Sequence, residues 1–222
     1  MKKNVIVLFL ISCFGVVSAC NTPEKGKNIA QTKSYSEEVI QKEKLETAYF
    51  ASGCFWCVEA VFQSVKGVKD AVSGYSGGYK KNPTYREISS GTLKHAEAVK
   101  VIYDPLQVDY ETLVKVFFGS HDPTTVNRQG PDRGPQYRSI VFYETMDEKK
   151  IIEKYMTKLE SDKVFSAPIV TEVVAFDIFW DAEDYHQEYE NKHPENGYVQ
   201  SVSIPRLKKF QAKFPELLKE NH

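Results

Sequence analysis

Apolar residues recur with two different periods along most of the chain. Short apolar runs bounded by Gly, Pro, Asn or Asp indicate strands, and spacings of i, i+3, i+4 and i+7 indicate amphipathic helices. A capping box at Thr145 and Glu148 marks the start of one helix. The patterns predict strands at 47–51, 68–72, 96–103, 137–143 and 169–176, and helices with apolar stripes at 58–65, 110–117 and 151–159.

The order of these elements favours an α+β fold. Strands and helices follow one another as β-α-β-β-α-β-α-β, and a further helical region follows at the C-terminus. This order is typical of a two-layer sandwich of ferredoxin-like type, with a β-α-β-β-α-β core and, here, a mixed sheet. No internal repeat is evident, so we expect residues 46–222 to form one catalytic domain.

The N-terminus is typical of a targeting segment. Lys2 and Lys3 precede the apolar run 5–17, and Val17-Ser-Ala-Cys20 follows. This ending resembles the bacterial lipobox, which implies a signal peptide at 1–19, a lipid on Cys20 and an anchored protein that faces outside the cytoplasm in the cell envelope. The alternative is plain secretion with Cys20 as an incidental thiol.

Residues 20–45 are polar and rich in lysine and glutamate, which predicts a flexible tether after the lipidated cysteine. A short helix at 36–44 is the alternative. The whole chain has 222 residues, 41% of them hydrophobic and 27% charged, as in globular proteins. Lys and Arg number 29 against 30 Asp and Glu, which gives no support to a nucleic-acid partner.

Two cysteines remain in the predicted domain. Cys54 and Cys57 form a C-x-x-C pair just after a predicted strand, at the first turn of a helix. Helix N-termini stabilise anions, so we expect the pKa of a thiol there to fall below the ~8.5 of a free cysteine. A zinc site would need two more ligands, but the five histidines are scattered. A structural disulfide across so short a loop would add little stability. Redox chemistry is therefore the favoured interpretation.

The residues around the pair show a more specific pattern. Gly53-Cys-Phe-Trp-Cys57 resembles the signature of the A-type peptide methionine sulfoxide reductases. An ordered series of matches extends this resemblance over about residues 47–190. The series comprises Gly74-Tyr-Ser-Gly-Gly-Tyr79, Asn82-Pro-Thr-Tyr85, Gly91, His95-Ala-Glu-Ala-Val99, Tyr103-Asp-Pro105, His121-Asp-Pro123, Gln136-Tyr-Arg-Ser139 and Ala182-Glu-Asp-Tyr-His-Gln187.

The resemblance implies thiol-dependent reduction of methionine S-sulfoxide, free or in proteins, as repair after oxidative stress. Such a reaction needs a nucleophilic thiolate and an acid that protonates the sulfoxide oxygen. Glu97 meets the second need, because it shares strand parity with the apolar residues Val99 and Val101. Without the resemblance, a salt-bridged glutamate on an edge strand would be the favoured interpretation of Glu97.

The resemblance also implies further site residues. It places Tyr85, Asp122 and Tyr137 around the sulfoxide oxygen, and it makes Phe55 and Trp56 walls for the S-methyl group. His95 and His186 are expected to be structural.

The implied cycle starts with attack by Cys54, which becomes a sulfenic acid, and Cys57 then forms a disulfide with it. A thioredoxin-like dithiol reopens this disulfide, and no cofactor or metal is implied. The chain departs from a common family pattern that has Gly at position 57 and resolving cysteines in the C-terminal tail, because residues 188–222 contain no cysteine.

Two other functions compete with this interpretation. A lipid-anchored thiol-disulfide oxidoreductase of thioredoxin-like type would share the C-x-x-C pair, but its tryptophan is expected before the first cysteine, whereas Trp56 lies between the two. A non-catalytic envelope module would carry an unreactive Cys54.

Overall fold

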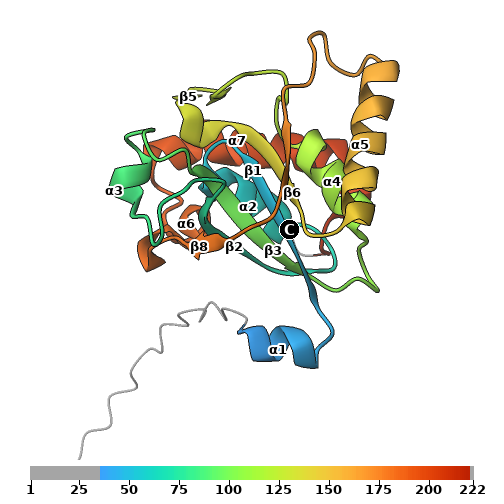
Figure 1. Cartoon of the computed structure of the whole chain (residues 1–222), viewed down its shortest axis with the longest axis horizontal. Coiled ribbons are helices and arrows are strands. Elements are labelled where there is room, and N and C mark those ends of the chain that lie inside the picture. The colour runs from blue at the N-terminus through green and yellow to red at the C-terminus, as the bar shows by residue number, and fades with distance from the viewer. Residues whose placement is uncertain (1–35, 221–222) are drawn as a thin grey trace, which may run out of the picture. The chain divides into compact units, whose positions relative to one another are not determined.

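The computed structural model describes residues 36–220 (Figure 1). The predicted signal peptide, the lipidation site at Cys20 and residues 20–35 of the predicted tether lie outside this range. Within it, no helix has the length and apolar character needed to cross a membrane. Residues 36–42 of the predicted tether form a capped helix, so the alternative of a short helix applies there.

The described residues form a sheet with helices packed on it. The strands of the main sheet are β1 (Glu46–Ser52), β2 (Val68–Ser76), β3 (Ala96–Tyr103), β6 (Ser139–Tyr143), β7 (Glu172–Ala175) and β8 (Phe179–Asp181), and β4 (Arg128–Gln129) and β5 (Asp132–Arg133) form a separate ribbon. The α-helices are α1 (Glu37–Lys42), α2 (Phe55–Gln63), α3 (Tyr85–Ile88), α4 (Tyr110–Gly119), α5 (Met146–Ser161), α6 (Tyr189–Lys192) and α7 (Ile204–Lys213). Single-turn 3₁₀ helices lie at Pro135–Tyr137, Asp184–His186 and Pro215–Leu217, and a π-helical turn lies at Val199–Ser203.

The strand order confirms the predicted fold class. The main sheet runs β7-β6-β1-β3-β2-β8, and its four central strands have the order of a ferredoxin-like β-α-β-β-α-β unit. Those strands pair antiparallel, whereas β6 and β7 pair parallel, so the sheet is mixed as predicted. The consequence for the site is that β1 and β3 are neighbours at the centre of the sheet, with Phe50 opposite Val99.

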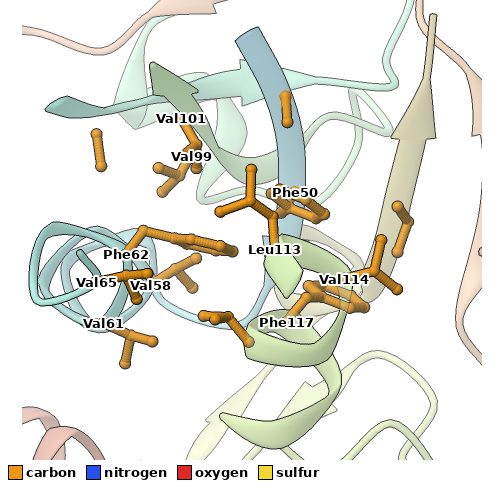
Figure 2. Packing of buried hydrophobic residues seen from close by; sticks show 14 of the residues in the cluster. Phe50, Val58, Val61, Phe62, Val65, Val99, Val101, Leu113, Val114 and Phe117 are labelled. Atoms are coloured by element: carbon orange, nitrogen blue, oxygen red, sulfur yellow. The ribbon is translucent and has the colours of Figure 1, made fainter. Parts of the chain in front are cut away.

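The main core lies between the sheet and the helices α2 and α4 (Figure 2). The apolar stripe of α2 faces β1 and β3, where Phe62 stacks on Phe50 with ring centroids 4.9 Å apart. Phe117 of α4 stacks on the same Phe50 ring at 5.4 Å. All three rings are fully buried, and truncation of such a side chain to alanine typically costs about 3–5 kcal/mol. β1 is thus packed against both α2 and α4 through the Phe50 ring.

Some element boundaries differ from the prediction. Strand β2 extends to Ser76, beyond the predicted end at residue 72, because its later residues are buried by β3 and β8. Residues 137–138 do not belong to β6, since Tyr137 ends a 3₁₀ turn that begins at Pro135. The three-residue strand β8 has no hydrophobic period of its own and was not predicted. The capping box at Thr145 and Glu148 is confirmed at the start of α5.

Candidate active site

A tight turn between β1 and α2 places the first cysteine. Gly53 has φ of +94°, a region in which side chains are strained, and Cys54 is the N-cap residue of α2. A Cβ atom on Gly53 would lie 2.6 Å from Cβ of Gln129. Only glycine therefore allows the strand to turn so sharply into the helix and bring the Cys54 thiol beneath the ribbon that carries Gln129.

We expect the substitution Gly53→Ala to lower the free energy of unfolding by about 2–4 kcal/mol, because backbone strain and the clash with Gln129 act together. Urea unfolding followed by circular dichroism measures this change. Gly130→Ala is the matched control, since Gly130 has φ of +55° but a Cβ atom there would meet no other atom within 4 Å. Its cost should be limited to about 1 kcal/mol from the backbone conformation. Equal losses in both variants would contradict the close approach at Gly53.

Glu97 lies on β3, beside the start of α2. Its side chain is buried, as its strand parity predicts, and its Oε2 accepts a hydrogen bond from the backbone N–H of Phe55 at 3.1 Å. Burial raises the pKa of Glu97 to about 8, because the ionised form loses its hydration. The carboxyl group therefore carries a proton at neutral pH. A protonated carboxyl beside a cysteine is the arrangement of a general acid next to a nucleophile.

The two thiols are free and buried, and each shifts the pKa of the other. Burial raises the pKa of Cys54 well above its ordinary value, which contradicts the expectation from the helix N-terminus. The pKa of Cys57 falls to about 6, first because it accepts the hydrogen bond from Cys54 and then because the Arg206 guanidinium attracts the thiolate. In the free enzyme the structure thus favours the anion on Cys57, and Cys57 is placed to take the proton that Cys54 must lose.

A cavity of about 300 Å³ opens next to Cys54. Phe55 and Trp56 form aromatic walls, as the sequence predicted. Trp56 is held from two sides, because its indole N–H donates to Nδ1 of His186 at 3.2 Å and its ring stacks on Tyr189 at 3.7 Å. The residues that line the cavity are Cys54, Phe55, Trp56, Tyr85, Glu97, Asp132, Tyr137, Asn196 and Tyr198.

The prediction that Asp122 lies at the sulfoxide oxygen is wrong. Asp122 is exposed, does not line the cavity, and its Oδ1 accepts hydrogen bonds from the backbone and hydroxyl of Thr124. Asp132 takes the place expected for it, and its Oδ2 accepts the hydroxyl proton of Tyr198 at 2.6 Å. Tyr85 and Tyr137 both line the cavity, as predicted.

Comparison with known proteins agrees with this geometry. The family model described as peptide methionine sulfoxide reductase matches residues 46–218. The chain is 48% identical over 173 residues to a peptide methionine sulfoxide reductase MsrA of Nitratiruptor, which covers 78% of this chain and 98% of that protein. It is 46% identical to the MsrA 2 enzyme of Synechocystis over 175 residues, 78% of this chain and 82% of that protein. The chain belongs to the peptide methionine sulfoxide reductase family.

Solved structures of this reductase family share the fold. The reduced form of Mxr1 from Saccharomyces cerevisiae matches with a TM-score of 0.65 and 30% identity over 75% of this chain and 92% of that one. Methionine sulfoxide reductase A of Corynebacterium diphtheriae matches with a TM-score of 0.62 and 36% identity, over 68% of this chain and 76% of that one. The protein is therefore an oxidoreductase that reduces methionine sulfoxide through thiols, and the thioredoxin-like and non-catalytic alternatives are wrong.

The part of this reductase that follows residue 186 supplies contacts that sequence patterns did not reveal. Tyr198 separates Asp132 from Cys57, with its hydroxyl 3.9 Å from the Cys57 sulfur. Arg206 donates to the backbone oxygens of Ser120 and Ser52 at 2.8 and 3.0 Å, which fixes its guanidinium near the thiols. The run His193-Pro-Glu-Asn-Gly-Tyr198 has turn residues but no period, so only the match to the family could have drawn attention to it.

The reductase offers a direct comparison between Asp132, which lines the cavity, and Asp122, which does not. Asp132→Asn keeps an oxygen that accepts the Tyr198 hydroxyl but removes the negative charge, which about halves a hydrogen bond worth about 1.5–3 kcal/mol, so kcat/KM for methionine sulfoxide should fall by about 3- to 10-fold. Asp122→Asn should change kcat/KM by less than about twofold, since Asp122 lies outside the cavity. Steady-state kinetics with dithiothreitol measure both values. A larger loss in Asp122→Asn than in Asp132→Asn would restore the sequence-based assignment.

Proposed function

We propose that this protein reduces the S epimer of methionine sulfoxide in proteins and peptides, with Cys54 as nucleophile and Glu97 as general acid. The observation that carries this proposal is that the Cys54 thiol and a carboxyl protonated at neutral pH line the same cavity between aromatic walls. Such a cavity accepts an S-methyl group and excludes water.

The first half of the reaction uses both thiols. Cys54 passes its proton to the Cys57 thiolate and attacks the sulfoxide sulfur, while Glu97 protonates the oxygen. The S–O bond of the substrate breaks, methionine leaves, and the oxygen remains on Cys54 as a sulfenic acid. Tyr85 and Tyr137 line the same cavity, where their hydroxyls are available to the sulfoxide oxygen. The substrate sulfur is reduced by two electrons and the Cys54 sulfur is oxidised by two.

The second half regenerates the nucleophile. Cys57 attacks the sulfenic acid and releases water, and a Cys54–Cys57 disulfide forms. A dithiol protein of thioredoxin type then reduces this disulfide. Cys54 and Cys57 are the two cysteines in residues 36–220, and they are already in contact, which supports Cys57 as the resolving thiol.

The cavity walls support selection of one sulfoxide epimer. Phe55 and Trp56 form its apolar surface, while Glu97 and the hydroxyls of Tyr85 and Tyr137 provide the polar groups. A chiral sulfoxide that places its methyl group against the rings and its oxygen toward Glu97 presents its sulfur to Cys54 in one configuration only.

We also propose that the enzyme is a lipoprotein of the cell envelope, anchored through Cys20, and that it repairs oxidised envelope proteins. The support is the lipobox-like run Val17-Ser-Ala-Cys20 after an apolar segment. Metabolic labelling of expressing cells with an alkyne fatty acid should mark the wild-type protein and the Cys13→Ala variant but leave Cys20→Ala unlabelled. A labelled Cys20→Ala protein would contradict the anchor.

The full-length protein in detergent, supplied with dithiothreitol and each epimer of a peptide methionine sulfoxide, tests the proposed reaction. Chromatography should show methionine from the S epimer alone, and Cys54→Ser should give no product from either epimer. Equal use of both epimers would contradict the stereochemical proposal. No product in a folded protein with a titratable Cys54 thiol would contradict the reaction itself.

A further inference from the structure

The second half of the proposed reaction needs a base next to Cys57. This cysteine takes the proton of Cys54 in the first half, so it is a thiol when the sulfenic acid has formed, and only its thiolate forms the disulfide. Cys57 is 2% exposed, so bulk water does not reach its proton directly. The largest cause of its lowered pKa, the Cys54 thiol, is also lost when Cys54 is oxidised. Another protein group therefore has to remove this proton.

Polar groups of the turn after α6 lie next to the Cys57 sulfur. The π-helical turn Val199–Ser203 packs against α2, and turns of this type are often found at functional sites. Tyr198 precedes the turn and holds its hydroxyl 3.9 Å from the Cys57 sulfur. Ser203 ends the turn and is fully buried. Its hydroxyl lowers the pKa of Cys57, in addition to the larger effects of Cys54 and Arg206. Two hydroxyl groups are thus close to the sulfur that must lose its proton.

The Ser203 hydroxyl leads to a carboxyl group. It donates a hydrogen bond to Oε2 of Glu190 on α6. Glu190 is only 8% exposed, so this carboxyl is buried together with the hydroxyl. Burial raises the pKa of Glu190, while the bond from Ser203 and the Arg206 guanidinium oppose that effect. A carboxylate with a raised pKa is a stronger base than an exposed glutamate, so Glu190 suits the removal of a proton.

Cys57, Ser203 and Glu190 form a chain along which a proton can move. While Cys57 is a thiol, its S–H can donate to the Ser203 oxygen, and the Ser203 hydroxyl donates to Glu190, as it does in the structure. After the proton has moved, the Glu190 carboxyl donates to Ser203, and the Ser203 hydroxyl donates to the thiolate. A hydroxyl group donates one hydrogen bond and accepts up to two, so Ser203 fits both arrangements. Only the hydroxyl proton has to turn between them.

The other hydroxyl near Cys57 leads to the substrate cavity instead. Tyr198 donates its proton to Oδ2 of Asp132 at 2.6 Å, and both residues line the cavity next to Cys54. A proton sent along that path would arrive in the space that binds the sulfoxide. Glu190 does not line this cavity. The path through Ser203 therefore keeps the proton of the second half away from the groups that serve the first half.

We propose that Glu190 is the base of the disulfide-forming step and that Ser203 relays the proton of Cys57 to it. The proposal rests on the proposed function, since it needs the Cys54 sulfenic acid. The Cys57 proton passes to the Ser203 oxygen while the Ser203 proton passes to Glu190. The Cys57 sulfur supplies the electron pair of the new S–S bond, the S–O bond of the sulfenic acid breaks, and the oxygen takes a second proton from solvent and leaves as water. Glu190 then returns its proton to solvent.

Glu190→Gln tests the base. Glutamine has the same size and its amide oxygen still accepts the Ser203 hydroxyl, but it cannot take a proton. The reduced full-length enzyme is mixed with one equivalent of methionine S-sulfoxide and quenched at successive times. Chromatography should show methionine formed at a rate within about twofold of the wild type, whereas mass spectrometry should show the Cys54–Cys57 disulfide forming about 10- to 100-fold more slowly. Dimedone should trap the sulfenic acid that accumulates on Cys54.

Two further variants complete the test. Ser203→Ala removes the relay and should slow disulfide formation as Glu190→Gln does, and the double variant should be no slower than the single ones, because both act on one path. Glu195→Gln is the matched control, since Glu195 is an exposed glutamate of the same segment, and both steps should keep their rates. Disulfide formation at the wild-type rate in Glu190→Gln would overturn the proposal, and so would an equal loss of both steps. Absence of methionine from the wild type would overturn the proposed function instead.

Discussion

Cys57→Ser should stop multiple turnover with thioredoxin while each enzyme molecule still produces one methionine. The substitution leaves Cys54 and Glu97 at the cavity, so the sulfoxide is still reduced, but no thiol lies in contact with the resulting sulfenic acid. We expect the steady-state rate with thioredoxin to fall by at least about 100-fold, since regeneration must then proceed without the disulfide. Rapid quench followed by chromatography gives the number of methionines formed per enzyme.

The rate of that single turnover tests whether Cys57 also acts as the base that accepts the proton of Cys54. In the wild type, the pKa of Cys57 is lowered to about 6, and its thiolate accepts the hydrogen bond from Cys54. Serine is not a base at neutral pH, so the variant should complete its one turnover more slowly, by about 10- to 100-fold. Cys20→Ser is the control for the other cysteine of the processed chain and should retain turnover with thioredoxin. Full multiple turnover in Cys57→Ser would refute the Cys54–Cys57 disulfide as a step of the cycle.

Glu97→Gln should lower kcat by about 10²- to 10⁴-fold, the usual contribution of a positioned general acid. The wild-type enzyme should hold its rate of sulfoxide reduction up to about pH 8 and lose it above, because the raised pKa of Glu97 keeps its carboxyl protonated below about 8. The variant should lack this alkaline limb. Single-turnover rates measured from pH 6 to pH 9.5 test both expectations.

The stability of Glu97→Gln separates a catalytic role from a structural one. The folded-state pKa of Glu97, about 8, lies above its unfolded value, so stability is greatest below the unfolded pKa and declines as the pH rises through about 8. The variant has no such ionisation, and its amide oxygen still accepts the N–H of Phe55, so its stability should decline less between pH 5 and pH 9. Inactivity accompanied by a large loss of stability at pH 6 would indicate that Glu97 serves the fold instead of the reaction.

Sequence patterns predicted those parts of the site that depend on local structure. A C-x-x-C pair after a strand places both sulfurs at the start of a helix, whichever way the rest of the chain folds. Strand parity likewise sets the face on which Glu97 lies, because successive side chains of a strand point to opposite sides. The fold class followed from the order of the elements in the same way, and the sheet order and the family match confirm it.

The prediction of Asp122 came from the family resemblance, and local patterns could not correct it. Asp122 and Asp132 both lie in the polar loop between α4 and β6, which has neither a helical nor a strand period. Their roles depend on how the ribbon of β4 and β5 folds back over Cys54, and this is set by pairing between Gln129 and Asp132. No signal within the loop distinguishes the two aspartates.

The sequence by itself predicted Cys54, Cys57, Glu97, Phe55 and Trp56 as site residues. A turn, a helix start and a strand parity only a few residues long set their positions, and the family resemblance supplied their roles. Only the tertiary structure decided which cysteine carries the negative charge and which residues line the cavity next to Cys54. Both depend on burial and on Tyr198 and Arg206, which lie more than a hundred residues along the chain from the thiols. Burial and long-range electrostatics arise from the packed molecule and leave no period in the sequence.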